Sequence, residues 1–341
     1  LLAIYETYKQ HNPDCRFIWI GTKKGAEKNI VEQYSIPFFT IASGKYRRYF
    51  SFSNFVDIFK IIIGFFQSLV LLLQERPSLI ITAGGFVSVP LHYAAAFLGI
   101  PAWVHQQDVQ VGLANKLMAW PAKKITTVLK SNLKDFSDKK TEWIGNPVRD
   151  LLVKDLEKSR LKFNIPKNSK VIFAFGGGTG SNKLNSLVIE ALPHFDKDWH
   201  VIHLTGKERS DKQSVGAINT FKNYHPYRFF TEEMKDAYAI ADVVVGRGGF
   251  VTITELAALT KPAVLLPLSN TQQEENVKML SEHQAAIILD EKKVNGLNLA
   301  HTVKELIAKP DVARHIGKRL HEMLPPAKNK KIINIIENLK N

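Results

Sequence analysis

Short apolar runs, several of which end at a glycine, alternate with helical segments along most of the chain. The clearest runs are residues 17–21, 37–41, 79–82, 102–105, 171–175, 199–204, 227–230, 243–245 and 263–268. Continuous apolar strands separated by helices are typical of parallel sheets that helices cover on both faces. The pattern predicts an α/β fold. It also limits where a site can lie, because open parallel sheets bind ligands at the carboxyl ends of their strands.

A lysine-rich polar stretch at residues 154–170 interrupts this alternation. The 341 residues are enough for two domains of ordinary size. We therefore predict two Rossmann-like, doubly wound domains that face each other across a cleft and are joined near residues 147–168. The chain opens with a helical pattern at residues 1–11, so we expect a strand that belongs to the first domain to precede Leu1.

The net charge and the cysteine content limit the classes of binding partner and the cellular compartment that are compatible with this chain. Lys and Arg number 46 against 32 Asp and Glu, a net charge of +14. This excess favours polyanions such as lipid headgroups or phosphate-bearing substrates, or it is simply a solvated surface. Basic residues are not interleaved with aromatic ones, so we expect no nucleic-acid partner. Cys15 is the only cysteine, which excludes an internal disulfide or a thiolate metal cage and favours a reducing compartment.

One apolar segment, residues 55–73, is a candidate for membrane contact. It contains Asp57 and Lys60, and its uncharged part, residues 61–73, is 13 residues long, whereas a spanning helix needs about 20. Two readings remain open. The segment is either a buried helix or an interfacial helix whose apolar side lies in lipid, with Lys45, Arg47 and Arg48 meeting anionic headgroups.

Residues 246–255, Gly-Arg-Gly-Gly-Phe-Val-Thr-Ile-Thr-Glu, follow a strand and open a helix. Free backbone N–H groups, threonine hydroxyls and the Arg247 cation at a helix start suit a diphosphate. Glu255 stands three residues after Thr252. Either the two form a capping box at the helix start, or the Glu255 carboxylate accepts two hydroxyls, as from a ribose.

A second glycine-rich turn, residues 176–181, lies between another strand and helix. It is either a phosphate loop or a plain tight turn. It lacks the Gly-Lys-Ser/Thr ending of a P-loop and the later acidic residue of NAD enzymes. Polar groups also follow the strands at 82–90, 105–108 and 272–276. His200 and His203 have no acidic cluster nearby, so we predict no metal site.

Taken in order, these motifs resemble those of the MurG family. The residues that carry the resemblance are 21–27, 84–90, 98–101 leading to His-Gln-Gln-Asp at 105–108, 112–116 and Gly-Asn-Pro-Val-Arg at 145–149. The family transfers N-acetylglucosamine from UDP-N-acetylglucosamine to lipid I, forming lipid II. The resemblance implies an inverting, metal-independent transferase of the GT-B architecture with no cofactor. The implied domains are residues 1–149, with the helix 326–341 packed back on them, and residues 150–325.

The resemblance and the local chemistry together give the predicted site. The donor-binding residues are Asp108, Arg149, Gly178, Thr231, Arg247, Phe250, Val251, Thr252, Ile253, Thr254, Glu255 and Gln273. The acceptor-side residues are Gly84, Gly85, Ser88, His105 and Asn115. The implied membrane patch is Phe55, Phe59, Ile62, Phe66, Lys45, Arg47 and Arg48, which places the enzyme on the cytoplasmic face of the cell membrane as a peripheral protein.

Three departures from the family pattern bear on catalysis. The family begins with a Gly-Gly-Thr-Gly-Gly-His loop, whose histidine is a proposed base and which we expect upstream of Leu1. Gln106 and Asp108 replace a Glu and an Asn, and Gly178 and Thr179 replace a Ser and a Gln. The base therefore stays unassigned, with His105 and Asp108 as candidates.

The rival functions are a diacylglycerol glycosyltransferase, a UDP-N-acetylglucosamine epimerase and a non-catalytic UDP-sugar or lipid-binding protein.

Overall fold

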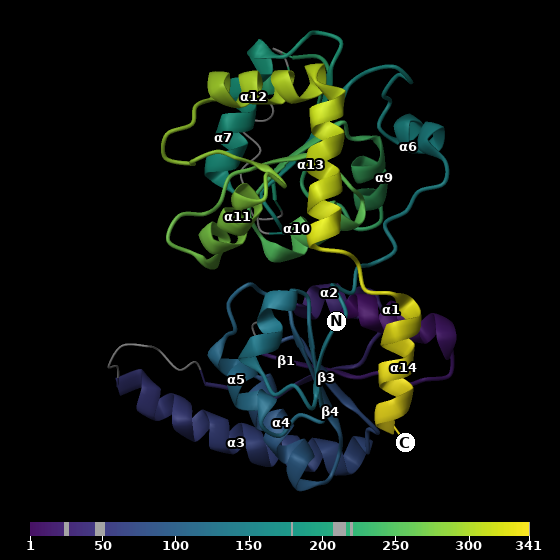
Figure 1. The fold of residues 1–341 in the computed structure, drawn as a ribbon, viewed down its shortest axis with the longest axis vertical. Coiled ribbons are helices and arrows are strands. Elements are labelled where there is room, and N and C mark those ends of the chain that lie inside the picture. The colour runs from purple at the N-terminus through teal and green to yellow at the C-terminus, as the bar shows by residue number, and fades with distance from the viewer. Residues whose placement is uncertain (24–26, 45–51, 179, 207–215, 219–220, 341) are drawn as a thin grey trace. The chain divides into compact units, whose positions relative to one another are not determined.

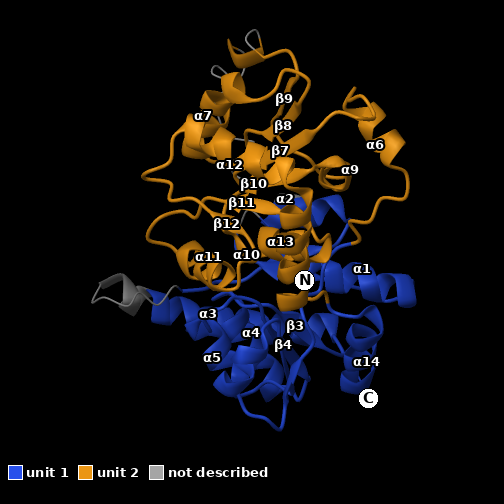
Figure 2. Cartoon of the chain, turned by 45° about the horizontal axis from the view of Figure 1, so that its top comes forward, with its two compact units in different colours: residues 1–149, 327–341 blue, residues 150–326 orange. Residues whose placement is uncertain are grey.

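The computed structural model describes residues 1–341 except 24–26, 45–51, 179, 207–215, 219–220 and 341. The chain folds into two compact units (Figure 2). Unit 1 consists of Leu1–Arg149 and Ala327–Asn341, and unit 2 of Asp150–Pro326. Each unit holds parallel strands and helices, so the predicted α/β fold is confirmed.

Unit 1 contains two parallel sheets. One pairs β1 (Trp19–Gly21) with β2 (Phe38–Thr40). The other has the order β3-β4-β5-β6, formed by Ile80–Thr82, Ala102–Gln106, Lys124–Thr127 and Thr141–Trp143. Its helices are α1 (Leu2–His11), α2 (Glu27–Gln33), α3 (Phe52–Glu75), α4 (Ser88–Phe97), α5 (Leu113–Ala119), the 3-10 helix η1 (Lys130–Asp135) and α14 (Asn329–Lys340).

The C-terminal helix of the chain belongs to unit 1. Ile332, Ile335 and Ile336 of α14 are buried in one apolar cluster with Ile4 and Tyr8 of α1. The Tyr8 hydroxyl donates to the Glu337 carboxylate and accepts from Lys340 Nζ at 2.9 Å. An apolar stripe at helical spacing on each helix, closed by this polar contact, joins the two ends of unit 1.

Unit 2 has one parallel sheet with the order β12-β11-β10-β7-β8-β9. Its strands are β7 (Val171–Phe175), β8 (His200–Leu204), β9 (Tyr224–Tyr227), β10 (Val243–Gly246), β11 (Ala263–Leu265) and β12 (Ile287–Ile288). Its helices are α6 (Leu156–Lys162), α7 (Asn182–Ala191), η2 (Leu192–His194), α9 (Glu233–Ile240), α10 (Phe250–Ala258), α11 (Gln272–Glu282), α12 (Gly296–Ala308) and α13 (Pro310–Met323). α7 lies against α12, and α6 against α9 (Figure 1).

Central strands of unit 2 follow the apolar runs closely, and the edge strand does not. All five residues of β7 are buried, as a strand covered on both faces requires. The predicted strand at 227–230 was wrong in position, because β9 spans Tyr224–Tyr227 and includes Pro226. Proline lacks the N–H that a ladder needs, but β9 is an edge strand, where proline is tolerated.

Candidate active site

The sheet of unit 2 has a topological switch point between β7 and β10. From β7 the chain moves to β8 and β9 on one side, and from β10 to β11 and β12 on the other. The glycine turns that follow β7 and β10 flank this point. Open α/β sheets bind ligands there, because the connections on either side diverge and expose the carboxyl ends of the strands.

The turn after β7 depends on its glycines. A Cβ on Gly176 would lie 2.6 Å from the backbone nitrogen of Ser181, and Gly177 and Gly180 have φ of +88° and +76°. Ser181 then caps α7 by accepting a hydrogen bond from Leu184 N. Gly178, a predicted donor residue, is exposed in this turn, while Thr179 lies outside the described residues.

The turn after β10 leads directly into α10. The helix begins at Phe250 with Gly249 as its N-cap, and no side chain caps it. Thr252 therefore lies within the first turn, so the capping-box alternative was wrong. The Thr254 hydroxyl donates to the Val251 carbonyl at 2.9 Å. The first backbone N–H groups of a helix have no partner within it and favour an anion.

Glu255 is held from a different helix. Its carboxylate accepts a hydrogen bond from the Tyr238 hydroxyl of α9 at 3.0 Å, and the residue is 6% exposed. The Tyr238 ring packs edge-on against Phe173 and Phe175 of β7. Tyr238 is not among the residues predicted from the sequence, because its partner lies 17 residues away on another element. A carboxylate fixed in this way can accept hydrogen bonds from a ligand without first being ordered.

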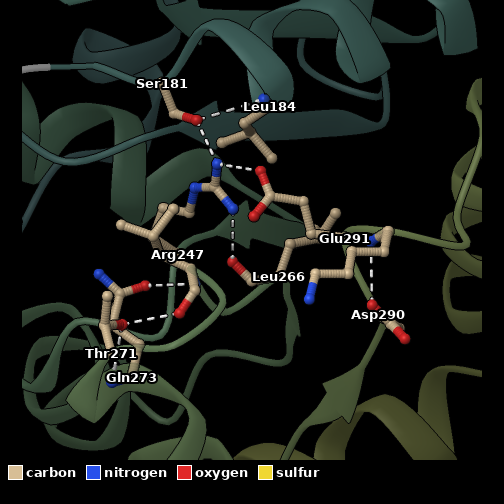
Figure 3. Close-up of polar contacts among 10 residues, drawn as sticks. Ser181, Leu184, Arg247, Leu266, Thr271, Gln273, Asp290 and Glu291 are labelled. Carbon is tan, nitrogen blue, oxygen red and sulfur yellow. Dashed lines mark hydrogen bonds and ion pairs between the residues drawn. The ribbon is translucent and has the colours of Figure 1, made fainter.

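Arg247 is engaged with protein groups on three sides (Figure 3). Nη1 donates to the Leu266 carbonyl at 3.1 Å, and Nη2 donates to the Glu291 carboxylate at 2.6 Å and to the Ser181 hydroxyl. The sequence pattern predicts Arg247 as a cation for the donor and does not point to Glu291. No local signal marks Glu291, which lies 44 residues further on in a charged stretch.

The other predicted donor residues of unit 2 lie at strand ends. Gln273, in the first turn of α11, accepts from Leu268 N through its side-chain oxygen at 2.9 Å. Asn276 in the same helix donates to the Gly248 carbonyl at 3.1 Å, which links α11 to the turn after β10. Thr231, just before α9, is exposed, and its N–H donates to the Glu233 carboxylate at 3.3 Å.

In unit 1, polar groups gather after β3 and β4. Gly84 and Gly85 have φ of +111° and +99°, which lets the chain turn into α4. The Thr82 hydroxyl donates to the Ser88 hydroxyl at 2.9 Å beside this turn. Asn115 Nδ2 donates to Gln106 Oε1 at 2.6 Å, and Gln106 Nε2 donates to the Asp108 carbonyl at 2.7 Å.

The two candidate bases differ in their surroundings. His105 is 2% exposed, and its Nδ1 lies 2.7 Å from the Thr126 hydroxyl. Burial lowers the pKa of its imidazole well below its usual range. Asp108 is partly exposed, and burial raises the pKa of its carboxyl. Asp108 is therefore the better-placed proton acceptor of the two.

Arg149, which the resemblance assigned to the donor, belongs to unit 1. It lies beside the Tyr34 hydroxyl, which also faces Glu6. Burial is the main cause that raises the pKa of Tyr34; Glu6 acts in the same direction, and Arg149 opposes it. No group of three or more His, Cys, Asp or Glu side chains that could hold a metal occurs among the described residues.

α3 presents an apolar face to solvent and packs its other face on α4. Gly64, Ser68 and Leu72 are buried. Phe59, Ile62 and Phe66 are exposed, so the alternative of a buried helix was wrong. We call the exposed apolar residues of α3, α4 and α5 the apolar face: Ile58, Phe59, Ile62, Ile63, Phe66, Val70, Leu73, Phe97, Leu113, Leu117 and Trp120. Lys45, Arg47, Arg48 and the Phe55 side chain lie outside the described residues.

By length and composition alone, the stretch Asp57–Glu75 of α3 is able to cross a membrane, and it is the one such helix in the described part of the chain. Only 28% of this stretch is buried. Its composition and exposure single this stretch out as a candidate for membrane contact.

The fold and the donor-side groups define the class of protein. The glycosyltransferase family 28 N-terminal domain model matches residues 1–127, and the C-terminal domain model matches residues 171–329. The chain is 36% identical over 293 residues, 84% of its length and 81% of the relative's, to the Clostridium perfringens UDP-N-acetylglucosamine–N-acetylmuramyl-(pentapeptide) pyrophosphoryl-undecaprenol N-acetylglucosamine transferase. The chain is therefore a family 28 glycosyltransferase and belongs to the MurG family.

Solved structures agree on the fold. The crystal structure of Acinetobacter baumannii MurG matches with a TM-score of 0.74 and 22% identity, covering 99% of this chain and 94% of the other. A Neisseria meningitidis UDP-N-acetylglucosamine 2-epimerase bound to UDP-N-acetylglucosamine reaches 0.70 with 11% identity, covering 98% and 95%. Both share the GT-B fold with this chain, so the fold alone does not separate a transferase from an epimerase.

Proposed function

We propose that this chain transfers N-acetylglucosamine from UDP-N-acetylglucosamine to lipid I, a polyprenyl-diphosphate-linked muramyl peptide, and so forms lipid II in peptidoglycan synthesis. The observation that carries the proposal is the pairing at the switch point of unit 2. There the uncapped start of α10 lies one turn ahead of the buried Glu255 carboxylate. A nucleoside diphosphate offers an anion and a pair of ribose hydroxyls, the two groups that this arrangement suits.

Each part of the donor has a counterpart in unit 2. The diphosphate accepts hydrogen bonds from the first N–H groups of α10, near Val251 and Thr252, and from the glycine turn that ends at Ser181. The ribose hydroxyls donate to Glu255, which Tyr238 holds in place. Gln273 offers an amide to the sugar hydroxyls, since amides both donate and accept.

The reaction then needs an attacking oxygen and a stabilised leaving group. The acceptor hydroxyl attacks the anomeric carbon of N-acetylglucosamine from the side opposite UDP, so the configuration inverts. The bond from that carbon to the UDP oxygen breaks, and its electron pair leaves with UDP. Backbone N–H groups and the α10 dipole stabilise the negative charge as it develops. The hydroxyl proton passes to a base, for which Asp108 is our candidate.

A transfer assay with two acceptors tests this function. The purified chain is incubated with labelled UDP-N-acetylglucosamine and a lipid I analogue, and labelled lipid is measured. We expect product with lipid I and none with diacylglycerol. Product only with diacylglycerol would replace the acceptor that we propose. Epimerised UDP-sugar formed without any acceptor would favour the isomerase, and UDP binding without turnover would favour the non-catalytic reading.

Substitution of Asp108 tests its role as the base. Asp108→Asn removes the proton acceptor and keeps the shape of the side chain. General bases contribute about 100-fold or more, so we expect kcat to fall by about that factor while the KM for UDP-N-acetylglucosamine changes little. The pKa of Asp108 is raised, so the wild-type activity should fall on the acid side at a pH above the usual range of an aspartate. If that acid limb persists in the Asn variant, another group is the base.

We further propose that the apolar face of unit 1 docks on the cytoplasmic surface of the cell membrane as a peripheral contact. Phe66 of α3 and Phe97 of α4 are 61% and 75% exposed, and their rings both pack against Phe65. Exposed aromatic and aliphatic side chains on neighbouring helices are costly in water and are typical of membrane contact. A polyprenyl acceptor requires the enzyme to work at that surface.

Vesicle sedimentation tests the docking. Phe66→Ser and Phe97→Ser are expected to reduce binding to vesicles that contain anionic lipid at least several-fold, with unchanged melting temperature, because both side chains already face solvent. Leu161→Ser in unit 2, at a residue that is 76% exposed, is the matched control and should bind as wild type does. Equal binding by all four proteins would contradict the proposal.

A further inference from the structure

Arg247 has the burial and the partners of a structural side chain, although it follows β10 at the switch point. The side chains of Arg247 and Glu291 are 8% and 12% exposed, and they form an ion pair at 2.6 Å. The positive charge of Arg247 is therefore matched inside the protein. A buried carboxylate that is left alone is costly, so Arg247 is not available to a diphosphate unless Glu291 loses its partner.

Arg247 and its three partners come from the segments that follow four neighbouring strands. Arg247 follows β10, Leu266 follows β11, Glu291 follows β12, and Ser181 ends the turn after β7 (Figure 3). These strands lie side by side in the order β12-β11-β10-β7. One guanidinium thus joins the segments that follow β10, β11 and β12, on one side of the switch point, to the turn that follows β7 on the other side. Its fork of rigid donors suits this task, whereas a lysine offers a single flexible ammonium.

Ser181 is the partner that connects this network to the proposed donor site. It accepts from Leu184 N as the cap of α7 and also accepts from Arg247. The glycine turn at residues 176–180 ends at this residue, and the turn of Gly248 and Gly249 follows Arg247 directly. Both turns carry the backbone N–H groups that the proposed function assigns to the diphosphate.

We propose that Arg247 and Glu291 are positioning residues that fix the two glycine turns of the donor site, and that Arg247 does not itself bind the diphosphate. The inference rests on the proposed function. Positioned N–H groups matter most when charge develops on the leaving UDP, so the pair acts on kcat more than on ground-state binding. This corrects the donor-ligand role that the sequence analysis gave to Arg247.

Substitutions of the pair separate the two roles. We expect Arg247→Gln, Glu291→Gln and the double variant each to lower kcat about 10-fold, with the Kd for UDP within about threefold of wild type. The losses should not add, because each change removes the same contact. If Arg247 binds the diphosphate instead, Arg247→Gln should raise the Kd for UDP at least 10-fold. Glu291→Gln should then leave kcat unchanged or lower the Kd for UDP. These results would refute the proposal.

Two further variants keep the proposal testable if the charge variants fail to fold. Arg247→Lys keeps the charge and one contact but loses the fork of donors, so its kcat should recover only in part, to a value between those of Arg247→Gln and wild type. Ser181→Ala leaves the ion pair intact and should lower kcat about threefold, even where the charge variants fail to fold. The control is Asp196→Asn, at an exposed pair with Lys304 in the same unit, which should match wild type. Wild-type kcat in Ser181→Ala would overturn the proposal.

Hydrogen exchange distinguishes failure of this inference from failure of the proposed function. We expect faster exchange of backbone amides at residues 181–184 and 248–249 in Glu291→Gln, whatever reaction the chain performs. If the wild-type chain transfers no sugar but these amides exchange faster in Glu291→Gln, the proposed function fails and the positioning role stands. Unchanged exchange in an active enzyme would refute the positioning role alone.

Discussion

The two units differ in whether their buried polar side chains have hydrogen-bond partners. Across the described residues of unit 2, every buried side-chain nitrogen and oxygen has a hydrogen-bond partner. In the part of unit 1 that the structure describes, six such atoms have none: both ring nitrogens of His92, His105 Nε2, Asn115 Oδ1, Thr127 Oγ1 and Asn132 Oδ1. Four of these five residues belong to β4, to β5 or to the helices that follow them, α5 and η1. The exception, His92, lies in α4.

The two units therefore differ in how far their buried polar side chains are fixed by hydrogen bonds before a ligand binds. In unit 2, Arg247, Glu255 and His203 are held by partners from other elements, so the proposed donor site needs little rearrangement before it binds. In unit 1, polar atoms near the predicted acceptor residues keep unused hydrogen-bonding capacity. An unpaired buried polar atom costs about 1–3 kcal/mol, so substitutions in the two units should have opposite effects on stability.

The largest effect is expected for Glu255→Gln in unit 2. Hydrogen bonds to a charged group contribute about 1.5–3 kcal/mol, so losing the charge that receives two ribose hydroxyls should lower kcat/KM for UDP-N-acetylglucosamine about 100-fold. Steady-state kinetics measures the loss. Tyr238→Phe, which removes only the hydrogen bond that orients Glu255, should lower it about 10-fold. A larger loss in Tyr238→Phe than in Glu255→Gln would contradict the assignment.

The second effect concerns volume at the strand ends. A Cβ on Gly248 would lie 2.6 Å from Val277 Cγ1 and 3.1 Å from the Gln273 backbone oxygen. Because overpacking costs about 1–3 kcal/mol, Gly248→Ala should lower the free energy of unfolding by about 2 kcal/mol. In unit 1, a Cβ on Gly112 would meet nothing within 4 Å, so Gly112→Ala is the control. Denaturant melts measure both, and equal destabilisation would remove the contrast.

The third effect is a pH dependence in unit 2. His203 Nδ1 lies 2.8 Å from the Tyr224 hydroxyl and Nε2 3.1 Å from Asn185 Oδ1, and burial lowers its pKa to about 3. The unfolded chain therefore takes up the proton first, and stability falls as pH drops below about 6.5 towards 3. His203→Leu should flatten this slope but reduce stability at pH 7.5 by about 1–2 kcal/mol, because both partners lose a hydrogen bond.

The smallest effect is expected for His92 in unit 1. Burial lowers the pKa of His92 to about 4, and neither ring nitrogen has a partner. His92→Leu should flatten the pH slope between about 6.5 and 4, as His203→Leu does. At pH 7.5, however, it should raise the free energy of unfolding by up to about 1 kcal/mol, because an unpaired polar group is removed. Melts of both variants at pH 5 and 7.5 measure this, and destabilisation of His92→Leu at pH 7.5 would show that His92 has a partner in solution.

Local patterns in the sequence were enough to predict much of the fold. Apolar runs such as Val171–Phe175 identify central strands, because both faces of such a strand are buried and its residues are therefore apolar at every position. They failed at β9, where Pro226 is compatible with an edge strand but not with a central one. The order of the motifs was enough to identify the MurG family, since several short patterns in sequence are far more specific than any one.

Periodicity and turn chemistry are local properties, so the α/β alternation, the glycine turns after the strands and the family follow from the order of the amino acids. The tertiary structure then sets which groups meet. Glu291 reaches Arg247 across 44 residues, and Tyr238 reaches Glu255 from another helix. It also decided that α10 begins at Phe250 rather than at Thr252. These outcomes depend on the order of strands in the sheet and on the packing of helices against it, and no local pattern encodes either.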